Sequence, residues 1–259
     1  MYTGLPAITG VYMDFAEMLG DALSYTKEGV LLNMNRWLKL ILAIICLGLP
    51  FSGYMMRIYR GKAPAPEVDE WGTLFVDGLK LFIVGFIYVL PIFIILAFVF
   101  GIMLLAGLTG SDEASIAAMG ASFLFQLVMF VFQIVIAIFL PVAYIRFART
   151  GLFSEAFNFS GILDTIRRIG WINYIVAVLL VNIVVSIPVC ILVVIFIILI
   201  MVGLVAAMAA GTAGLVLLVL LLVFMLAVIL VILPPLGVFQ ARYMARLYDC
   251  AAPAEAPVI

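Results

Sequence analysis

The sequence predicts an all-α protein that crosses the membrane several times, and its composition and its long apolar runs support this prediction. Of its 259 residues, 68% are hydrophobic and 10% are charged, and the mean hydropathy is +1.39. Soluble domains are about 45–50% apolar and about 25% charged, so a soluble fold of this length could not bury so much apolar surface. The apolar residues form runs long enough for helices to cross a hydrocarbon core about 30 Å thick. The predicted fold is therefore a polytopic transmembrane helix bundle.

Five long apolar runs predict five spans. They cover residues 38–56, 79–108, 114–145, 171–210 and 214–240. The fourth run would extend about 60 Å as one helix, so six spans are the alternative if the chain turns near Pro188 or Gly203. A turn within lipid would leave backbone polar groups without partners, and no loop-like cluster interrupts this run. We therefore expect five spans.

Amphipathic segments accompany these spans, with apolar residues at helical spacing. We expect them to lie at the membrane interface or against the spans. They cover residues 11–32, 71–82 and 151–169. The patterns divide the chain into an interfacial N-terminal segment (1–37), a transmembrane helical domain (38–248) and an Ala/Pro-rich mobile tail (249–259).

The basic residues predict an orientation. With five spans, ten Lys and Arg residues lie on the side of the loops 57–80 and 146–168 and the C-terminal tail, and three lie on the other side. The positive-inside rule then places the N-terminus outside and the C-terminus in the cytoplasm, in a multi-pass protein of the cell membrane. The net charge of −1 leaves no basic surface for nucleic acid.

The residue types needed for catalysis or metal binding are scarce. There is no histidine, and Cys46, Cys190 and Cys250 lie far apart in the sequence. No phosphate-binding glycine loop, nucleophile elbow or metal-ligand spacing is present. We therefore expect no enzyme, no catalytic residue, no cofactor and no metal. Acidic and basic side chains are also missing from the interior of the spans, which argues against a proton-coupled pump.

Four polar side chains within the spans are candidates for a site. Gln126 and Gln133 are seven residues apart on one face of the third span, and Asn182 and Ser186 are four apart on one face of the fourth. They predict either an interhelical hydrogen-bond seam or the lining of a narrow polar pore or small-ligand site.

Arginines near the span ends form a second candidate site, on one face of the membrane. They either determine the topology or bind anionic lipid headgroups. Acidic residues of the connectors, namely Asp69, Glu70, Asp77 and Glu155, could equally pair with them. The arginines are Arg57, Arg60, Arg146, Arg149, Arg167, Arg168, Arg242 and Arg246.

Three spans end alike, with a proline followed by an arginine. These endings are Pro50 to Arg57, Pro141 to Arg146, and Pro235 to Arg242. They predict a parallel repeat of a span, an amphipathic connector and a returning span. The alternative is that arginine is simply common at the cytoplasmic ends of spans. A parallel repeat is mild evidence against transporters built from inverted repeats.

Several short motifs connect the chain with a known family. They read GYMMR at 53–57, DEWGTLF at 69–75, DGLK at 77–80 and FSEAF at 153–157. With these motifs the chain resembles, over residues 35–248, multi-pass membrane proteins that are frequent in archaeal genomes and catalogued as a domain of unknown function (number four-zero-one-three). The resemblance implies an α-helical bundle with interfacial connectors, and it supplies no activity and no catalytic residue.

These observations predict a non-catalytic membrane scaffold or assembly component, with membrane lipids, further copies of the chain or a membrane complex as partners. The alternative is a channel or transporter that passes a small solute or ion through a polar seam between the third and fourth spans. A third hypothesis is a lipid-binding protein that recognises anionic headgroups through its arginines.

Overall fold

The computed structural model describes residues 14–109 and 111–251, most of which are helical. A π-helical turn (Lys27–Leu31) and a 3₁₀ helix (Phe153–Phe157) accompany the α-helices. The α-helices are α1 (Phe15–Thr26), α2 (Met34–Ile45), α3 (Leu49–Tyr59), α4 (Trp71–Thr109), α5 (Asp112–Thr150), α6 (Phe159–Ile169), α7 (Trp171–Ala210) and α8 (Thr212–Asp249).

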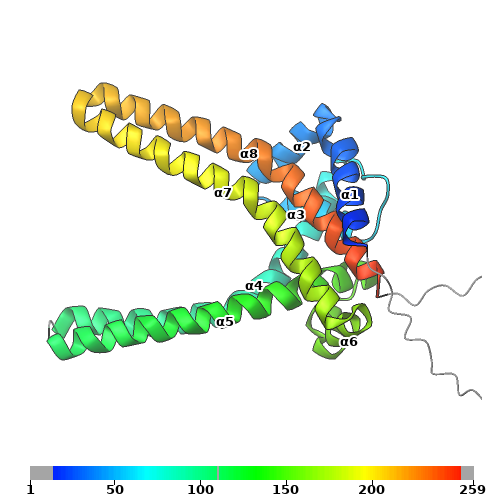
Figure 1. Ribbon diagram of the computed structural model, residues 1–259, viewed down its shortest axis with the longest axis horizontal. Helices are drawn as coiled ribbons and strands as arrows, with labels where there is room; N and C mark the ends of the chain where they lie inside the picture. Colours follow the sequence, from blue (N-terminus) through cyan, green and yellow to red (C-terminus); the bar gives the residue numbers. More distant parts are fainter. Residues whose placement is uncertain (1–13, 110, 252–259) are drawn as a thin grey trace, which may run out of the picture.

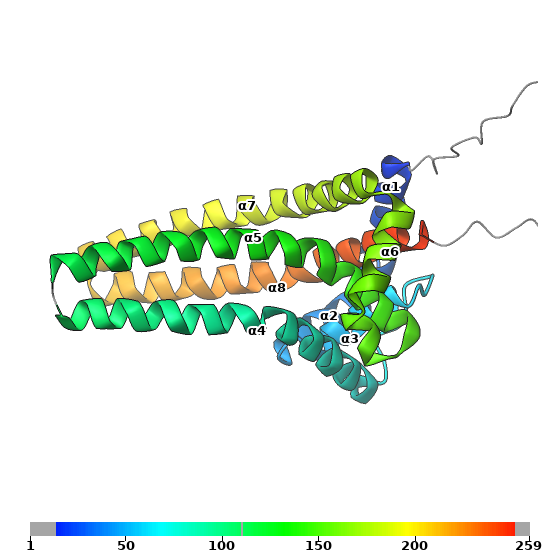
Figure 2. The same cartoon turned by 90° about the horizontal axis from the view of Figure 1, so that it is seen from below.

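Two long helical hairpins extend from a folded head (Figure 1). Helices α4 and α5 form one hairpin and α7 and α8 form the other, and the two hairpins converge at the head and diverge toward their tips. The short helices α1, α2, α3 and α6 gather at the head, around the near ends of the long helices (Figures 1 and 2). We refer to the diverging parts of the hairpins as the arms.

Four helices of the described part of the chain are long and apolar enough to cross a membrane, namely α4, α5, α7 and α8. Their most apolar stretches have mean hydropathies of 2.7 to 3.7. The structure thus agrees with an all-α, multi-pass membrane protein, and it offers four such helices where the sequence predicted five spans.

The first predicted span, over 38–56, is wrong because this region folds as two short helices. The break lies at Leu47 and Gly48, which have positive φ angles of 63° and 70°. The left-handed conformation ends α2, and Pro50 in the first turn of α3 has a φ suited to starting a new helix. Helices of 11 or 12 residues reach only about 18 Å, which is too short to cross a bilayer.

The six-span alternative is also wrong, because α7 is one unbroken helix of 40 residues that contains Pro188. The chain reverses at Gly211, whose φ is +56°, and α8 begins at the next residue. The two ends of the described chain lie together at the head (Figure 1), where α1 packs on α8. This arrangement does not agree with the prediction that the N-terminal segment and the C-terminus lie on opposite sides.

The N-terminal amphipathic segment packs on the protein itself, as one of the two expected placements stated. Helix α1 lies against the last turns of α8, where Met18 and Ala22 join a buried cluster with Tyr243 and Leu247. Residues 11–13 of the predicted segment and 252–259 of the predicted mobile tail lie outside the described residues.

The buried core lies in the head, whereas few residues of the arms are buried. Tyr54, Tyr174 and Tyr243 are fully buried there, each from a different helix. By contrast, at most 11% of the residues in the most apolar stretch of each spanning helix are buried. The protein's own contacts therefore hold the head together, while most of the arm surface faces outward.

Candidate functional site in the charged head

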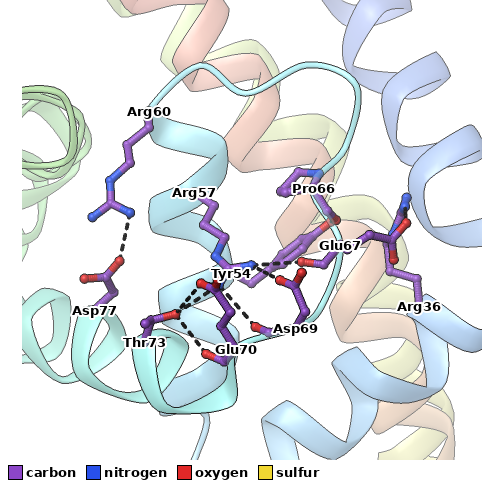
Figure 3. Close-up of polar contacts among 10 residues, drawn as sticks. All are labelled: Arg36, Tyr54, Arg57, Arg60, Pro66, Glu67, Asp69, Glu70, Thr73 and Asp77. Atoms are coloured by element: carbon purple, nitrogen blue, oxygen red, sulfur yellow. Dashed lines mark hydrogen bonds and ion pairs between the residues drawn. The ribbon is translucent and has the colours of Figure 1, made fainter.

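Arg57, in the last turn of α3, is the centre of a polar network that holds the connector between α3 and α4 (Figure 3). Its Nη1 donates to Asp69 Oδ1 at 2.5 Å and to the Glu67 carbonyl at 3.0 Å. Its Nη2 donates to the Asp69 carbonyl at 3.1 Å, Thr73 Oγ1 at 3.1 Å and Glu70 Oε2 at 3.3 Å. One nearly buried guanidinium thus links α3, the connector and the first turn of α4.

Two further side chains fix the same connector (Figure 3). The Tyr54 hydroxyl donates to the Pro66 carbonyl at 3.1 Å. Arg36 on α2 pairs with Glu67 and donates to the Gly29 carbonyl at 2.8 Å. Because these contacts come from α2 and α3 together, they tie both short helices to the connector.

Two glycines explain how α3 and α4 come so close. A Cβ on Gly53 would overlap the backbone carbonyl of Leu74, and a Cβ on Gly78 would overlap that of Leu49. The two helices therefore meet backbone to backbone, which only glycine permits. The motifs at 53–57, 69–75 and 77–80 thus form one packing unit.

The carboxylate of Asp69 in the connector is stabilised in its ionised form by Arg57. The hydrogen bond from Arg57 lowers the pKa of Asp69, with a smaller contribution from the positive charge. Arg60 Nη1 lies 2.8 Å from Asp77 Oδ2 in a second pair on the same two helices. A carboxylate held in its charged form is suited to a permanent ion pair and poorly suited to proton transfer near neutral pH.

A second network forms where α5 meets α6. Arg146 pairs with Glu155 and donates through Nη1 to the Gly161 carbonyl at 3.1 Å and Thr165 Oγ1 at 3.3 Å. The hydrogen bond from Arg146 lowers the pKa of Glu155, and one from Asn158 adds to the effect. Like Arg57, Arg146 lies near the end of a helix and binds residues that follow that helix in the sequence.

The third network joins the two ends of the described chain. Arg242 donates to both carboxylate oxygens of Asp21, at 2.7 and 3.2 Å, and its guanidinium lies 4.6 Å from the centre of the Tyr25 ring. The Tyr25 hydroxyl donates to the Lys62 carbonyl at 3.1 Å, and burial raises its pKa to about 12. Arg246 lies 3.6 Å from the same Asp21. These contacts fix α1 to α8.

The eight predicted arginines thus have different roles in the head. Arg57, Arg60, Arg146, Arg242 and Arg246 pair with acidic residues of neighbouring elements. Arg149 pairs with Asp249 at 2.6 Å, while Arg167 pairs with Asp164 of its own helix at 3.2 Å. The expected pairing of Asp69, Glu70, Asp77 and Glu155 with these arginines is confirmed.

The structure does not bring the four polar residues of the arms together. Gln126 and Gln133 are exposed on α5, while Asn182 and Ser186 donate to carbonyls of their own helix at 2.7 and 3.0 Å. At about 100° per residue, the two glutamines lie about 120–140° around α5 from Ile138. The Ile138 carbonyl accepts from Tyr174 of α7 at 2.5 Å. The glutamine face therefore differs from the face of α5 that contacts α7 at Ile138, and no hydrogen bond joins the glutamines to Asn182 or Ser186 within the described residues.

Sequence reasoning missed Asp21, Arg36, Glu67 and Asp249 as members of the networks. Asp21 lies 221 residues from its partner Arg242, so no spacing rule could pair them. The charged residues of the amphipathic segments could have indicated members of these networks. A charged side chain that becomes buried on folding needs a partner of opposite charge.

A comparison with protein families identifies the family of the chain. The sequence profile of a family described as a protein of unknown function (DUF4013) matches residues 38–197, which is more than half of the chain and runs from α2 into α7. No curated protein and no solved structure matches the chain.

Proposed function

The chain belongs to the DUF4013 family of proteins of unknown function, and we propose that it is a non-catalytic membrane scaffold that assembles with further copies of itself. The observation that carries this proposal is the contrast in burial between the head and the arms. In each spanning helix at most 11% of the most apolar stretch is buried. Helices that their own chain leaves open are covered in a membrane by lipid or by other helices.

The glutamines of α5 favour a second copy as part of that cover. Gln126 and Gln133 are exposed, on a face of α5 other than the one that contacts α7 at Ile138, and an amide facing hydrocarbon without a partner is unfavourable. A glutamine amide both donates and accepts hydrogen bonds, so the same residue of a second copy is a suitable partner. A two-fold interface through α5 would bring identical glutamines together.

The basic residues support an orientation with the head in the cytoplasm. All 13 Lys and Arg residues lie in the head or on the head-side parts of the long helices. The hairpin tips carry none, and Asp112 and Glu113 are the charged residues there. This distribution follows the positive-inside rule more closely than the division expected for five spans.

Self-association can be tested with the double variant Gln126→Leu, Gln133→Leu. Interhelical hydrogen bonds in membranes contribute about 0.6 kcal/mol each, so removing two should weaken association about tenfold. The matched control is Asn182→Leu with Ser186→Ala, because these side chains bond within their own helix. Subunit counting by photobleaching in vesicles, over a range of protein-to-lipid ratios, measures the association.

Two results would contradict the scaffold proposal. One is a wild-type protein that stays monomeric at every protein-to-lipid ratio. The other is solute or ion flux through reconstituted vesicles that the glutamine variant abolishes while association is unchanged, since this would favour the channel alternative.

A further inference from the structure

A polar cavity of about 530 Å³ opens in the head between the last turns of α5 and α8 and helix α6. Three arginines and two carboxylates contribute to its lining, namely Arg146, Arg149, Arg168, Asp164 and Asp249. The cavity therefore gathers three of the eight arginines into one concave site, while the other five lie elsewhere in the head.

Backbone contacts hold two of these arginines in place before any ligand binds. Arg146 donates to the Gly161 carbonyl, and a Cβ on Gly161 would overlap its guanidinium. Arg149 donates through Nε to the Tyr59 carbonyl at 2.6 Å and lies over Gly61, where a Cβ would come within 2.8 Å of the guanidinium. Preorganised donors bind with a smaller entropic cost than mobile ones.

The charges of the cavity are unbalanced in favour of the cations. Asp249 pairs with Arg149, whereas Asp164 pairs with Arg167, which does not line the cavity. Arg168 is exposed and forms no ion pair within residues 14–109 and 111–251. Arg146 is paired with Glu155, so Arg168 supplies the unpaired positive charge among the described lining residues. A guanidinium without an ion-pair partner matches the oxygens of a phosphate group in geometry and charge.

We propose that this cavity binds a phosphate group carried by a lipid headgroup or by a small soluble phosphate ester, with Arg168 as the principal ligand and Arg149 and Arg146 beside it. The volume exceeds that of a bare phosphate and lies in the usual range of small-molecule sites. The proposal does not depend on the scaffold function, since it concerns the head alone.

Adjacent arginines of α6 give a matched pair of variants for the test. Arg168→Ala and Arg167→Ala remove the same charge from neighbouring exposed positions, but only Arg168 lines the cavity. Binding to the purified full chain is measured by calorimetry with inorganic phosphate and glycerol phosphate. Co-sedimentation with vesicles of phosphatidylcholine, with and without phosphatidic acid, measures binding to the lipid form.

We expect Arg168→Ala to weaken binding about tenfold, as loss of a charge-assisted hydrogen bond does, and Arg167→Ala to change it less than twofold. Asp164→Asn should strengthen binding about twofold, because it removes a negative charge from the cavity wall. A preference for phosphatidic acid vesicles identifies a lipid headgroup as the ligand, and binding of glycerol phosphate identifies a soluble ester. Equal losses in the two arginine variants, or no binding to any of the probes, would overturn the proposal.

Discussion

The two ends of α4 show how differently the chain treats its head and its arms. At the head, the backbone of Gly78 touches the carbonyl of Leu49, and a side chain there has no room. In the arm of the same helix, nothing lies within 4 Å of the position that a Cβ on Gly101 would occupy. The chain thus packs tightly on itself in the head and makes few contacts with itself along the apolar arms.

The contrast between head and arms requires that four helices cross the membrane. Cysteine labelling tests this number of spans with an all-or-none result. In a background without the three native cysteines, Glu28→Cys, Glu113→Cys and Ser154→Cys place single thiols at exposed positions. We expect a membrane-impermeant maleimide to label positions 28 and 154 from the same side, and position 113 from the opposite side. Labelling of intact and permeabilised cells measures this.

Position 28 distinguishes the four-helix structure from the five-span prediction. Five spans would place it on the side of position 113, because residues 38–56 would then cross the bilayer. Such a result would mean that α1 does not pack on the head end of α8.

The second prediction compares glycines of the two regions. Gly78→Ala should destabilise the head by about 2–3 kcal/mol, because the new methyl group would force α3 and α4 apart. The melting temperature in detergent should fall by several degrees. Gly101→Ala is the matched control, and it should leave the melting temperature unchanged or slightly raised, since alanine favours a helix and meets no neighbour. Equal effects of the two variants would mean that the head is no better packed than the arms.

Much of the arm architecture could be predicted from the sequence. The apolar run at 171–210 coincides with α7, because Gly170 and Gly211 bound it and both adopt positive φ. Hydropathy could not reveal that 38–56 is two helices, since the break at Leu47 depends on a left-handed turn and not on polarity.

The candidate site could be predicted only where partners are close in sequence. Arg57 and Asp69 are 12 residues apart, and a link between span ends and acidic connectors was anticipated. The pair of Arg242 and Asp21 depends on the docking of α1 and left no local signal. Helical spacing likewise placed Gln126 and Gln133 on one face of α5, but it could not show which neighbour that face would meet.

The third prediction concerns the network at Arg57. Arg57→Met should destabilise the α3–α4 connector by about 2 kcal/mol, because it removes charge-assisted hydrogen bonds to Asp69 and to backbone carbonyls. Trypsin should then cleave after Lys62 more than tenfold faster, because the connector opens more often. Mass spectrometry measures the rate of this cleavage. Arg60→Met removes a single, more exposed pair, and we expect at most a threefold change. Cleavage at the wild-type rate in Arg57→Met would show that other contacts hold the connector.

The smallest expected effect is a dependence of head stability on acid. Hydrogen bonds from arginines lower the pKa values of Asp69 and Glu155 in the folded protein. Their stabilisation is therefore complete above the pKa values of the unfolded chain, about 3.9 and 4.3, and it is lost as the pH falls through the lower folded values. The contribution of these two carboxylates to the melting temperature should thus be nearly constant from pH 7 to pH 5. It should decline below about pH 4.

The double variant Asp69→Asn, Glu155→Gln isolates this contribution. It should melt only a few degrees below the wild type at pH 7, because the carboxylates are partly exposed and such ion pairs contribute little. Below about pH 4 the difference should shrink, since the wild-type carboxylates are then becoming protonated. A difference that stays constant down to pH 3 would mean that the two side chains act through shape and neutral hydrogen bonds, and the head would then owe its order chiefly to the backbone contacts of Gly53 and Gly78.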